Sequence, residues 1–199
     1  MANVNAPMGA VAATRRRDSE HLEWFDIPAS DGTAVYRGDF VASNSTGTTG
    51  GIPQCIRHTA GAPILGRVVA FAPDISGGNL TRIYRPASTN MKVLVDTDPN
   101  QEFYLMEDAV GGAVAVTAIG QNASVIYGTA VAALGCSGMM LDSSTAATTA
   151  TLEIRILGLK QAADNAQGNY AIWRCKINVS ERDSIDTTAS DTQTGALGT

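Results

Sequence analysis

The chain has few of the residue types from which most active sites are built. Only two of its 199 residues are histidines, and its three cysteines include no Cys-x-x-Cys pair. An odd number of isolated cysteines argues against a disulfide framework and favours reduced thiols. Charged residues make up only 17% of the chain and aromatic residues 6%. Such a small charged fraction also argues against a helix bundle, whose surface would be rich in Glu and Lys.

Long apolar runs are missing as well. No stretch approaches the roughly 18 apolar residues that a membrane-spanning helix needs. The first residues, MANVNAPMGAVAA, lack the basic start and the uninterrupted apolar part of a signal peptide. We therefore expect a protein that is made and kept in a cytoplasm, or assembled there into something larger, and that has no membrane partner.

The chain also lacks the positive charge of a protein that binds nucleic acid without sequence preference. Its formal net charge is −5, and the only basic cluster is Arg15, Arg16 and Arg17. Asp18 and Glu20 follow this cluster directly. The pattern predicts a solvated arm, and we expect no nucleic-acid partner.

What the chain does contain is a series of short apolar runs, separated by turn residues at spacings of roughly 10 residues. This pattern predicts an all-β fold, a sandwich or barrel without long helices. The first residues have no strong period, and the last ones are rich in Thr, Ser and Asp. We expect an extended N-terminal arm over residues 1–21, one β domain over residues 22–179 and a flexible polar tail over residues 180–199.

Alternation is clearest near the end of the predicted domain, in residues 170–179. There the sequence YAIWRCKINV predicts a strand with Ala171, Trp173, Cys175 and Ile177 on one face. Trp24 also lies in a strand-like run, so both tryptophans are predicted to be in the core. By contrast, the composition of residues 43–51, SNSTGTTGG, predicts a flexible loop.

Residues 93–108, VLVDTDPNQEFYLMED, raise the question of a calcium site, because four oxygen-bearing side chains follow the spacing of a calcium loop. However, Gln101 occupies the position that needs Gly, and both flanks are typical of strands rather than helices. We therefore predict a β-hairpin with a plain turn and no metal. The four side chains are Asp96, Asp98, Asn100 and Glu107.

Other candidate sites are incomplete. Cys55 and His58 have the spacing of a zinc-binding pair, but no further ligands stand near them in sequence. Cys136 and Ser137 lie between glycines, without the spacing of a nucleophile elbow. The sequence predicts no catalytic residue, metal or cofactor, and points to a protein that acts by contact.

Several stretches in the same order resemble the structural cement, or head decoration, proteins of bacteriophages, over most of residues 1–178. The resemblance implies a β-barrel, often jelly-roll-like, that docks on the outside of an expanded icosahedral head. It also implies that the YRP motif and the predicted hairpin are fold elements rather than catalytic ones. Residues 12–17 depart from the family pattern, which leaves the path of the arm open. The stretches are MANVNAPMG, FDIPASDGTAVYRGD, GRVVAFAPD, RIYRPAST, VLVDTDPNQEFYLMED, DSSTAATTATLEIRILGL and YAIWRCKIN.

The resemblance also implies the major capsid protein as the partner and the outer capsid surface as the location. We expect the arm to reach a neighbouring subunit and to become ordered only on docking. Deletion of residues 2–17 is then expected to abolish head binding and to leave the body folded. The candidate capsid contacts are Asn3, Asn5, Met8, Arg15, Arg16 and Arg17.

The resemblance leaves the oligomeric state open between a homotrimer at three-fold positions, which we favour, and a homodimer at two-fold positions. One alternative function is a lectin-like binding module on the virion surface, for which exposed aromatic side chains on a loop would argue. A hydrolase that uses Cys136 or His58 is a further alternative.

Overall fold

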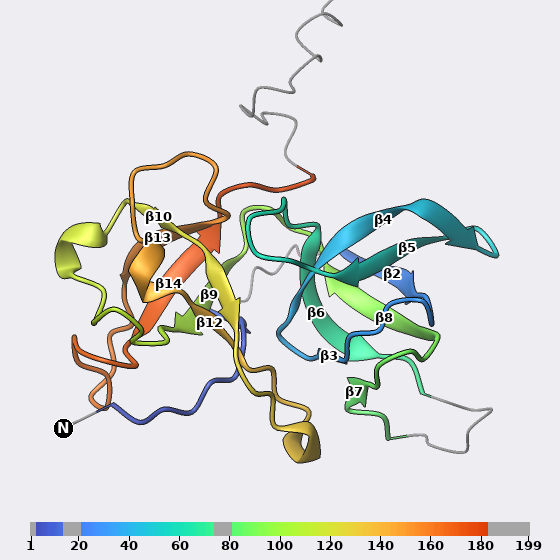
Figure 1. Cartoon of the computed structure of the whole chain (residues 1–199), viewed down its shortest axis with the longest axis horizontal. Coiled ribbons are helices and arrows are strands. Elements are labelled where there is room, and N and C mark those ends of the chain that lie inside the picture. Colours follow the sequence, from blue (N-terminus) through green and yellow to red (C-terminus); the bar gives the residue numbers. More distant parts are fainter. Residues whose placement is uncertain (1–2, 14–20, 74–80, 183–199) are drawn as a thin grey trace, which may run out of the picture.

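Five strands from the first half of the chain close into a barrel (Figure 1). The structure is a computed structural model that describes residues 3–13, 21–73 and 81–182. Around the barrel the strand order is β2-β5-β4-β6-β8, and only the β2–β5 pair is parallel. The five strands are β2 (Leu22–Ile27), β4 (Phe40–Thr49), β5 (Ile52–Arg57), β6 (Gly66–Phe71) and β8 (Met91–Asp96).

The second half of the chain forms an antiparallel five-stranded sheet beside the barrel. Its strand order is β1-β9-β14-β13-β10, so the N-terminal segment supplies one edge. We call this part of the molecule the sheet lobe. Its strands are β1 (Val11–Ala12), β9 (Glu102–Met106), β10 (Asn122–Ala123), β13 (Ile154–Leu159) and β14 (Ile172–Ile177).

Smaller elements complete the fold. Among the described residues, helix is confined to three short 3-10 turns, and no helix there is long and apolar enough to cross a membrane. The predicted all-β fold with a barrel is therefore confirmed. The remaining elements are β3 (Val35–Tyr36), β7 (Tyr84–Arg85), β11 (Val125–Tyr127), β12 (Met139–Leu141), η1 (Val116–Ala118), η2 (Ala132–Leu134) and η3 (Ser143–Thr145).

The predicted alternation of residues 170–179 is confirmed in β14. Trp173, Cys175 and Ile177 are buried, whereas Arg174 between them is exposed. The central position of β14 between β9 and β13 explains why one whole face of this strand is apolar.

The predicted hairpin of residues 93–108 is wrong. Its first strand, β8, pairs with β2 and β6 in the barrel, and its second strand, β9, pairs with β1 and β14 in the sheet lobe. The turn between them is the crossover from one lobe to the other. Two apolar runs around a turn are compatible with both arrangements, because the local pattern does not determine which strands pair.

Residues 43–51 were predicted to be a flexible loop, and this prediction is also wrong. Ser43 lies within β4, which continues to Thr49 and pairs with β5 through a register shift between Ser43 and Thr48. Thr is common in strands, and pairing with β5 outweighs the loop-like composition.

Two apolar cores fill the structure. The barrel core is small and aliphatic-rich, with nine buried side chains, and the core of the sheet lobe is larger and contains the fully buried Trp173. Phe40 and Ile64 come from the barrel half of the chain but belong to the sheet-lobe core. The lobes therefore share packing at their junction.

The end of the described chain adds hydrogen bonds across this junction. Val179, just after β14, accepts a hydrogen bond from the Ile64 amide (3.0 Å), and the Glu181 amide donates to the Ile64 carbonyl (2.9 Å). Arg182 then pairs with Glu23 on β2 at 2.6 Å. The first residues of the predicted tail, 180–182, thus lie against the barrel, and the rest of it, 183–199, is outside the described residues.

Candidate interaction surface

The N-terminal segment, residues 3–13, runs along the free edge of β9. Val11 pairs with Tyr104 and Ala12 with Phe103, and the Ala13 amide donates to the Glu102 carbonyl at 2.9 Å. An uncovered strand edge presents unpaired amides and carbonyls, so this segment protects the edge from pairing with other chains. From here on, the arm means residues 3–13, which are part of the arm predicted over residues 1–21.

The arm also contacts the barrel half of the chain. The Ala10 amide donates to the Gly38 carbonyl (2.9 Å), and an Arg67 Nη donates to the Ala10 carbonyl (3.4 Å). The Ala10 side chain is 2% exposed and belongs to the sheet-lobe core. The arm therefore bridges both lobes.

Two glycines make this close crossing feasible. Gly9 and Gly38 have φ values of +69° and +91°, in the left-handed region that other residues rarely adopt. A Cβ atom added to Gly9 would lie only 2.6 Å from the Ser137 Cβ and 2.8 Å from the Gly38 carbonyl oxygen. A larger residue at position 9 would force the arm away from the body.

The described candidate contacts have different environments within the chain. The Asn3 amide nitrogen donates to the carbonyls of Ala166 (2.8 Å) and Asn169 (3.1 Å). Asn5 is exposed, and Met8 is 53% exposed at the mouth of a pocket. The other three candidates, Arg15, Arg16 and Arg17, lie outside the described residues.

These contacts bear on two expectations for the arm. Residues 3–13 lie on the body of their own chain, in contact with β9 and with the barrel half. Deletion of residues 2–17 would remove Ala10 from the core and uncover β9. The deletion would therefore change one edge of the body as well as remove the arm, and the folding of the shortened body stays a prediction.

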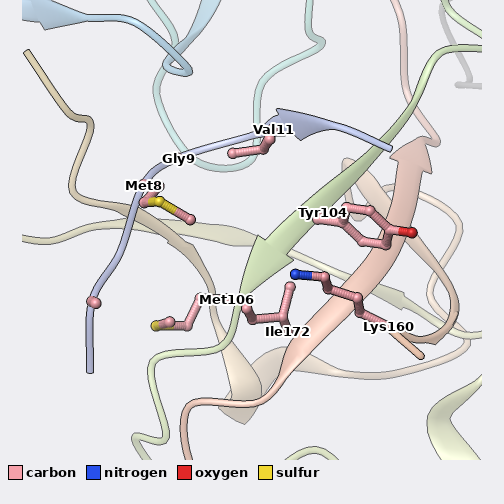
Figure 2. Close-up of a pocket in the computed structure, with 8 residues that line it drawn as sticks. Met8, Gly9, Val11, Tyr104, Met106, Lys160 and Ile172 are labelled. Atoms are coloured by element: carbon pink, nitrogen blue, oxygen red, sulfur yellow. The ribbon is translucent and has the colours of Figure 1, made fainter. Parts of the chain in front are cut away.

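A pocket lies between the arm and the sheet (Figure 2). The empty space in it and at its mouth, open solvent included, is about 340 Å³. In Figure 2, Met8 on the arm and Met106 on the sheet face the same space, and the Lys160 nitrogen points toward the arm. The lining residues are Ala6, Met8, Gly9, Val11, Tyr104, Met106, Lys160 and Ile172.

A second exposed feature is the long connection between β11 and β12. Residues 128–138, which carry η2, contain no charged side chain, and Leu134 and Val131 are 67% and 43% exposed. Gly135 packs against Ile83, itself 47% exposed, so the three apolar side chains belong to neighbouring segments. We call residues 131–134 together with Ile83 the apolar tip. The sequence showed an apolar run here but not its exposure.

Exposed apolar side chains also occur at two further places. The loop of residues 109–121, around η1, exposes Val110, Val116 and Ile119. On the barrel, β2 exposes Leu22 and Trp24. The predicted core position of Trp24 is wrong, because this side chain is 47% exposed and only Phe25 beside it faces the barrel core.

Asp39 and Ser137 form a buried polar contact behind the arm crossing. The Ser137 hydroxyl donates to one Asp39 carboxylate oxygen, and the Tyr36 amide donates to the other at 2.8 Å. Burial raises the pKa of Asp39 to about 6, against the opposing effect of these hydrogen bonds. This serine is therefore held by a carboxylate, with no histidine bonded to it, and Cys136 beside it bonds only weakly to the Leu134 carbonyl.

Cys55 and His58 do not form a metal site. Cys55 is enclosed in the barrel core, and burial raises the pKa of its thiol to about 12. His58 is buried with both ring nitrogens engaged, by the Tyr127 hydroxyl (3.2 Å) and the Ala62 carbonyl (2.8 Å), and burial lowers its pKa. No group of three or more His, Cys, Asp or Glu suited to a metal occurs in the described part of the chain. All three cysteines are free thiols, as predicted.

The three carboxylates of the suspected calcium loop are engaged by other groups of the chain. Asp98 accepts a hydrogen bond from the Asn100 amide (2.8 Å), and Asp96 pairs with Arg67 (3.3 Å). Glu107 is fully buried in the sheet lobe, where it accepts the indole N–H of Trp173 at 3.0 Å. Burial raises the pKa of Glu107. These side chains hold turns and a core in place.

Arg85 of the YRP motif is completely buried and also structural. Its guanidinium donates to the carbonyls of Thr89 (2.7 Å), Pro28 (2.7 Å) and Asp31 (2.8 Å), and to that of Thr33. Its charge is balanced by the Asp31 carboxylate at 3.6 Å. One side chain thus joins the loop after β2 to the loop after β7.

Comparison with known proteins gives no family assignment. Neither a family model, a curated protein nor a solved structure matches the chain. The resemblance to phage cement proteins therefore stays a prediction, and the functional argument depends on the surface described above.

Proposed function

We propose that the protein is a phage capsid cement protein, which binds the outer surface of the expanded icosahedral head. In this role it bridges neighbouring major capsid proteins and stabilises the shell against the pressure of packed DNA. The proposal needs no chemical turnover and no cofactor. It places the protein in the virion after synthesis in the bacterial cytoplasm.

The observation that carries the proposal is the distribution of exposed apolar side chains. They occur at the apolar tip, around η1, on β2 and on the arm. In Figure 1, η1 and β2 lie at opposite ends of the molecule, and η2 projects between them. Scattered single apolar side chains are normal on a surface, but grouped ones on projecting loops indicate contact with other proteins. Several such groups suit a protein that touches more than one neighbour.

Bridging makes modest contacts effective. A protein that binds the closed lattice better than the open one stabilises the closed lattice by mass action. When one contact has formed, the next forms within the same complex at high effective concentration. A stable junction in total buries on the order of 1,600 Å². Four small apolar surfaces on one rigid body approach this value more readily than any one of them alone.

The junction between the lobes supports the same role. Phe40, Ile64 and Ala10 pack into the sheet-lobe core from segments that also contact the barrel. A clamp has to transmit force between its two binding ends, so shared packing at the junction suits it. A homotrimer about a local three-fold axis remains our favoured assembly, and a homodimer is its alternative.

One observation favours the lectin-like alternative. Trp24 is half-exposed, and Tyr36 stacks on Tyr84 with ring centroids 5.0 Å apart. Aromatic surfaces of this kind bind the apolar faces of sugars, and a glycan array with the wild type and Trp24→Ala would reveal such binding. Trp24 lies on a strand, however, and not on the loop that the lectin hypothesis requires.

The test is rebinding to particles from which the protein has been removed. We expect the wild type to sediment with the particles and to raise the temperature at which they release DNA. Leu134→Asp should weaken both effects, because it places a charge on the apolar tip. Thr148→Asp, on an exposed polar loop, is the matched control and should behave as wild type. No sedimentation of the wild type would overturn the proposal.

A further inference from the structure

The pocket between the arm and the sheet has a chemical character of its own. Apart from Lys160 and Tyr104, its side chains are aliphatic or thioether groups. Lys160 places its ammonium 5.4 Å from the centre of the Tyr104 ring. Small-molecule sites typically combine apolar walls with a few fixed polar groups.

The charge of Lys160 is available for a ligand. Among the residues that the structure describes, no carboxylate forms an ion pair with it. The face of an aromatic ring attracts a cation but leaves its hydrogen-bond donors free. A lysine at an apolar pocket is therefore complementary to a molecule with one anionic group and an apolar chain.

We propose that this pocket binds a small monocarboxylic acid with a short aliphatic chain. The chain lies between Met8 and Val11 of the arm on one side and Met106 and Ile172 of the sheet on the other. The carboxylate pairs with Lys160. A free small molecule fits better than a protein segment because the enclosed part of the pocket is small, the volume of about 340 Å³ including open solvent at its mouth.

Such a ligand would also hold the arm in place. Four lining residues, Ala6, Met8, Gly9 and Val11, belong to the arm, and three, Tyr104, Met106 and Ile172, to the sheet. A ligand that contacts both binds the docked arm better than the released arm, and so shifts the population toward docking. This inference does not depend on the proposed role in a capsid.

The test uses the full chain and hexanoate as the probe, with NMR titration of the Met8 and Met106 methyl groups. We expect saturable shifts with a Kd that is roughly millimolar, as suits so small a ligand. Hexanamide, which has the same shape but no charge, should bind about ten-fold more weakly or worse. Equal binding of the two probes, or no binding of hexanoate, would overturn the proposal.

Variants separate the pocket from the rest of the surface. Lys160→Met should lower hexanoate affinity at least about ten-fold, and Lys160→Arg should retain most of it. Lys92→Met, at an exposed position in the barrel, is the control and should bind as wild type. Undiminished binding by Lys160→Met would contradict the assignment.

Arm docking has its own measurement, which also works if a variant is less stable. The amides of Ala10 and Ala13 donate to Gly38 and Glu102, so their hydrogen exchange reports release of the arm. Saturating hexanoate should slow both amides severalfold in the wild type and leave them unchanged in Lys160→Met. Unchanged exchange in saturated wild type would refute the coupling to the arm.

Discussion

The barrel and the sheet lobe are stabilised in different ways. The barrel closes on itself, has no free strand edge and needs only a small aliphatic core. Its long loops are joined by one buried guanidinium, that of Arg85. The sheet lobe is open, has a larger core around Trp173 and depends on the arm to cover the edge of β9.

The stability of the two lobes therefore depends on different parts of the sequence. In the barrel, the hydrogen bonds of one buried charged residue, Arg85, supply part of the stability that a larger apolar core would otherwise supply. In the sheet lobe, a remote segment of the chain completes the structure. Loss of the Arg85 hydrogen bonds should unfold the barrel as a unit. Loss of the arm from β9 should open an edge of the sheet lobe and leave most of its core intact.

Replacement of Arg85 should have the largest effect. Arg85→Met keeps most of the apolar volume but removes one donor from each of four carbonyls and the ion-pair partner of the Asp31 carboxylate. We expect a loss of about 4 kcal/mol in the free energy of unfolding, measured by urea denaturation. Arg155→Met, exposed on β13, should change it by less than about 0.5 kcal/mol. A small effect at Arg85 would remove the contrast between the lobes.

The junction between the lobes should give a pH-dependent signal from Asp39. Its pKa in the folded protein, about 6, is higher than the value of about 3.9 expected in the unfolded chain. The stabilisation from protonated Asp39 is therefore fully present below about pH 4 and is lost as the pH rises to about 6. This loss corresponds to about 3 kcal/mol.

Asp39→Asn isolates this contribution, because the amide resembles the protonated carboxyl group. The lowered pKa of His58 acts in the opposite direction over a similar pH range, and the raised pKa of Glu107 in the same direction. The effects of His58 and Glu107 are present in both the wild type and the variant. We expect the difference in unfolding free energy between variant and wild type to grow in favour of the variant between pH 4 and pH 6. A constant difference would contradict the raised pKa.

The core of the sheet lobe can be tested at its largest side chain. Trp173→Phe removes the N–H donor to Glu107 and leaves a cavity in the core. We expect a loss of about 2 kcal/mol in unfolding free energy and a further rise in the pKa of Glu107. Trp24→Phe, the same change at a half-exposed position, should cost less than about 1 kcal/mol in a parallel denaturation experiment.

The smallest global effect should come from the arm. Gly9→Ala places a methyl group against Ser137 and Gly38, in a backbone conformation that alanine adopts poorly. We expect a loss of about 1 kcal/mol and much faster hydrogen exchange at the Ala10 and Ala13 amides, with the barrel amides unaffected. Gly32→Ala, at an exposed site with open space, is the control. Equal acceleration in both lobes would show that the arm is not a separate unit.

The sequence was informative where structure follows from local patterns. The alternation in residues 170–179 predicted the buried face of β14, and the spacing of apolar runs predicted an all-β fold. It was misleading where pairing is non-local. The runs of β8 and β9 resemble a hairpin, yet each finds its partners in a different lobe.

The candidate surface was less accessible from sequence. The burial of Ala10 and the exposure of Trp24 depend on which segments cross them, and nothing in the neighbouring residues indicates this. The apolar tip did leave a signal, because it lies within residues 109–141, a stretch without charged side chains that is much longer than one strand requires. Arg85, between Tyr84 and Pro86, was also evident in the sequence, but the four carbonyls to which it donates could not be predicted from the sequence.

Cryo-electron microscopy of phage particles assembled in cells that produce this chain tests the proposed capsid role most directly. Our account predicts density for the two-lobed body on the outside of the shell, with the apolar tip and the η1 loop against different major capsid subunits. Particles without this density on their outer surface, or with the body bound to a single subunit through one end, would contradict it.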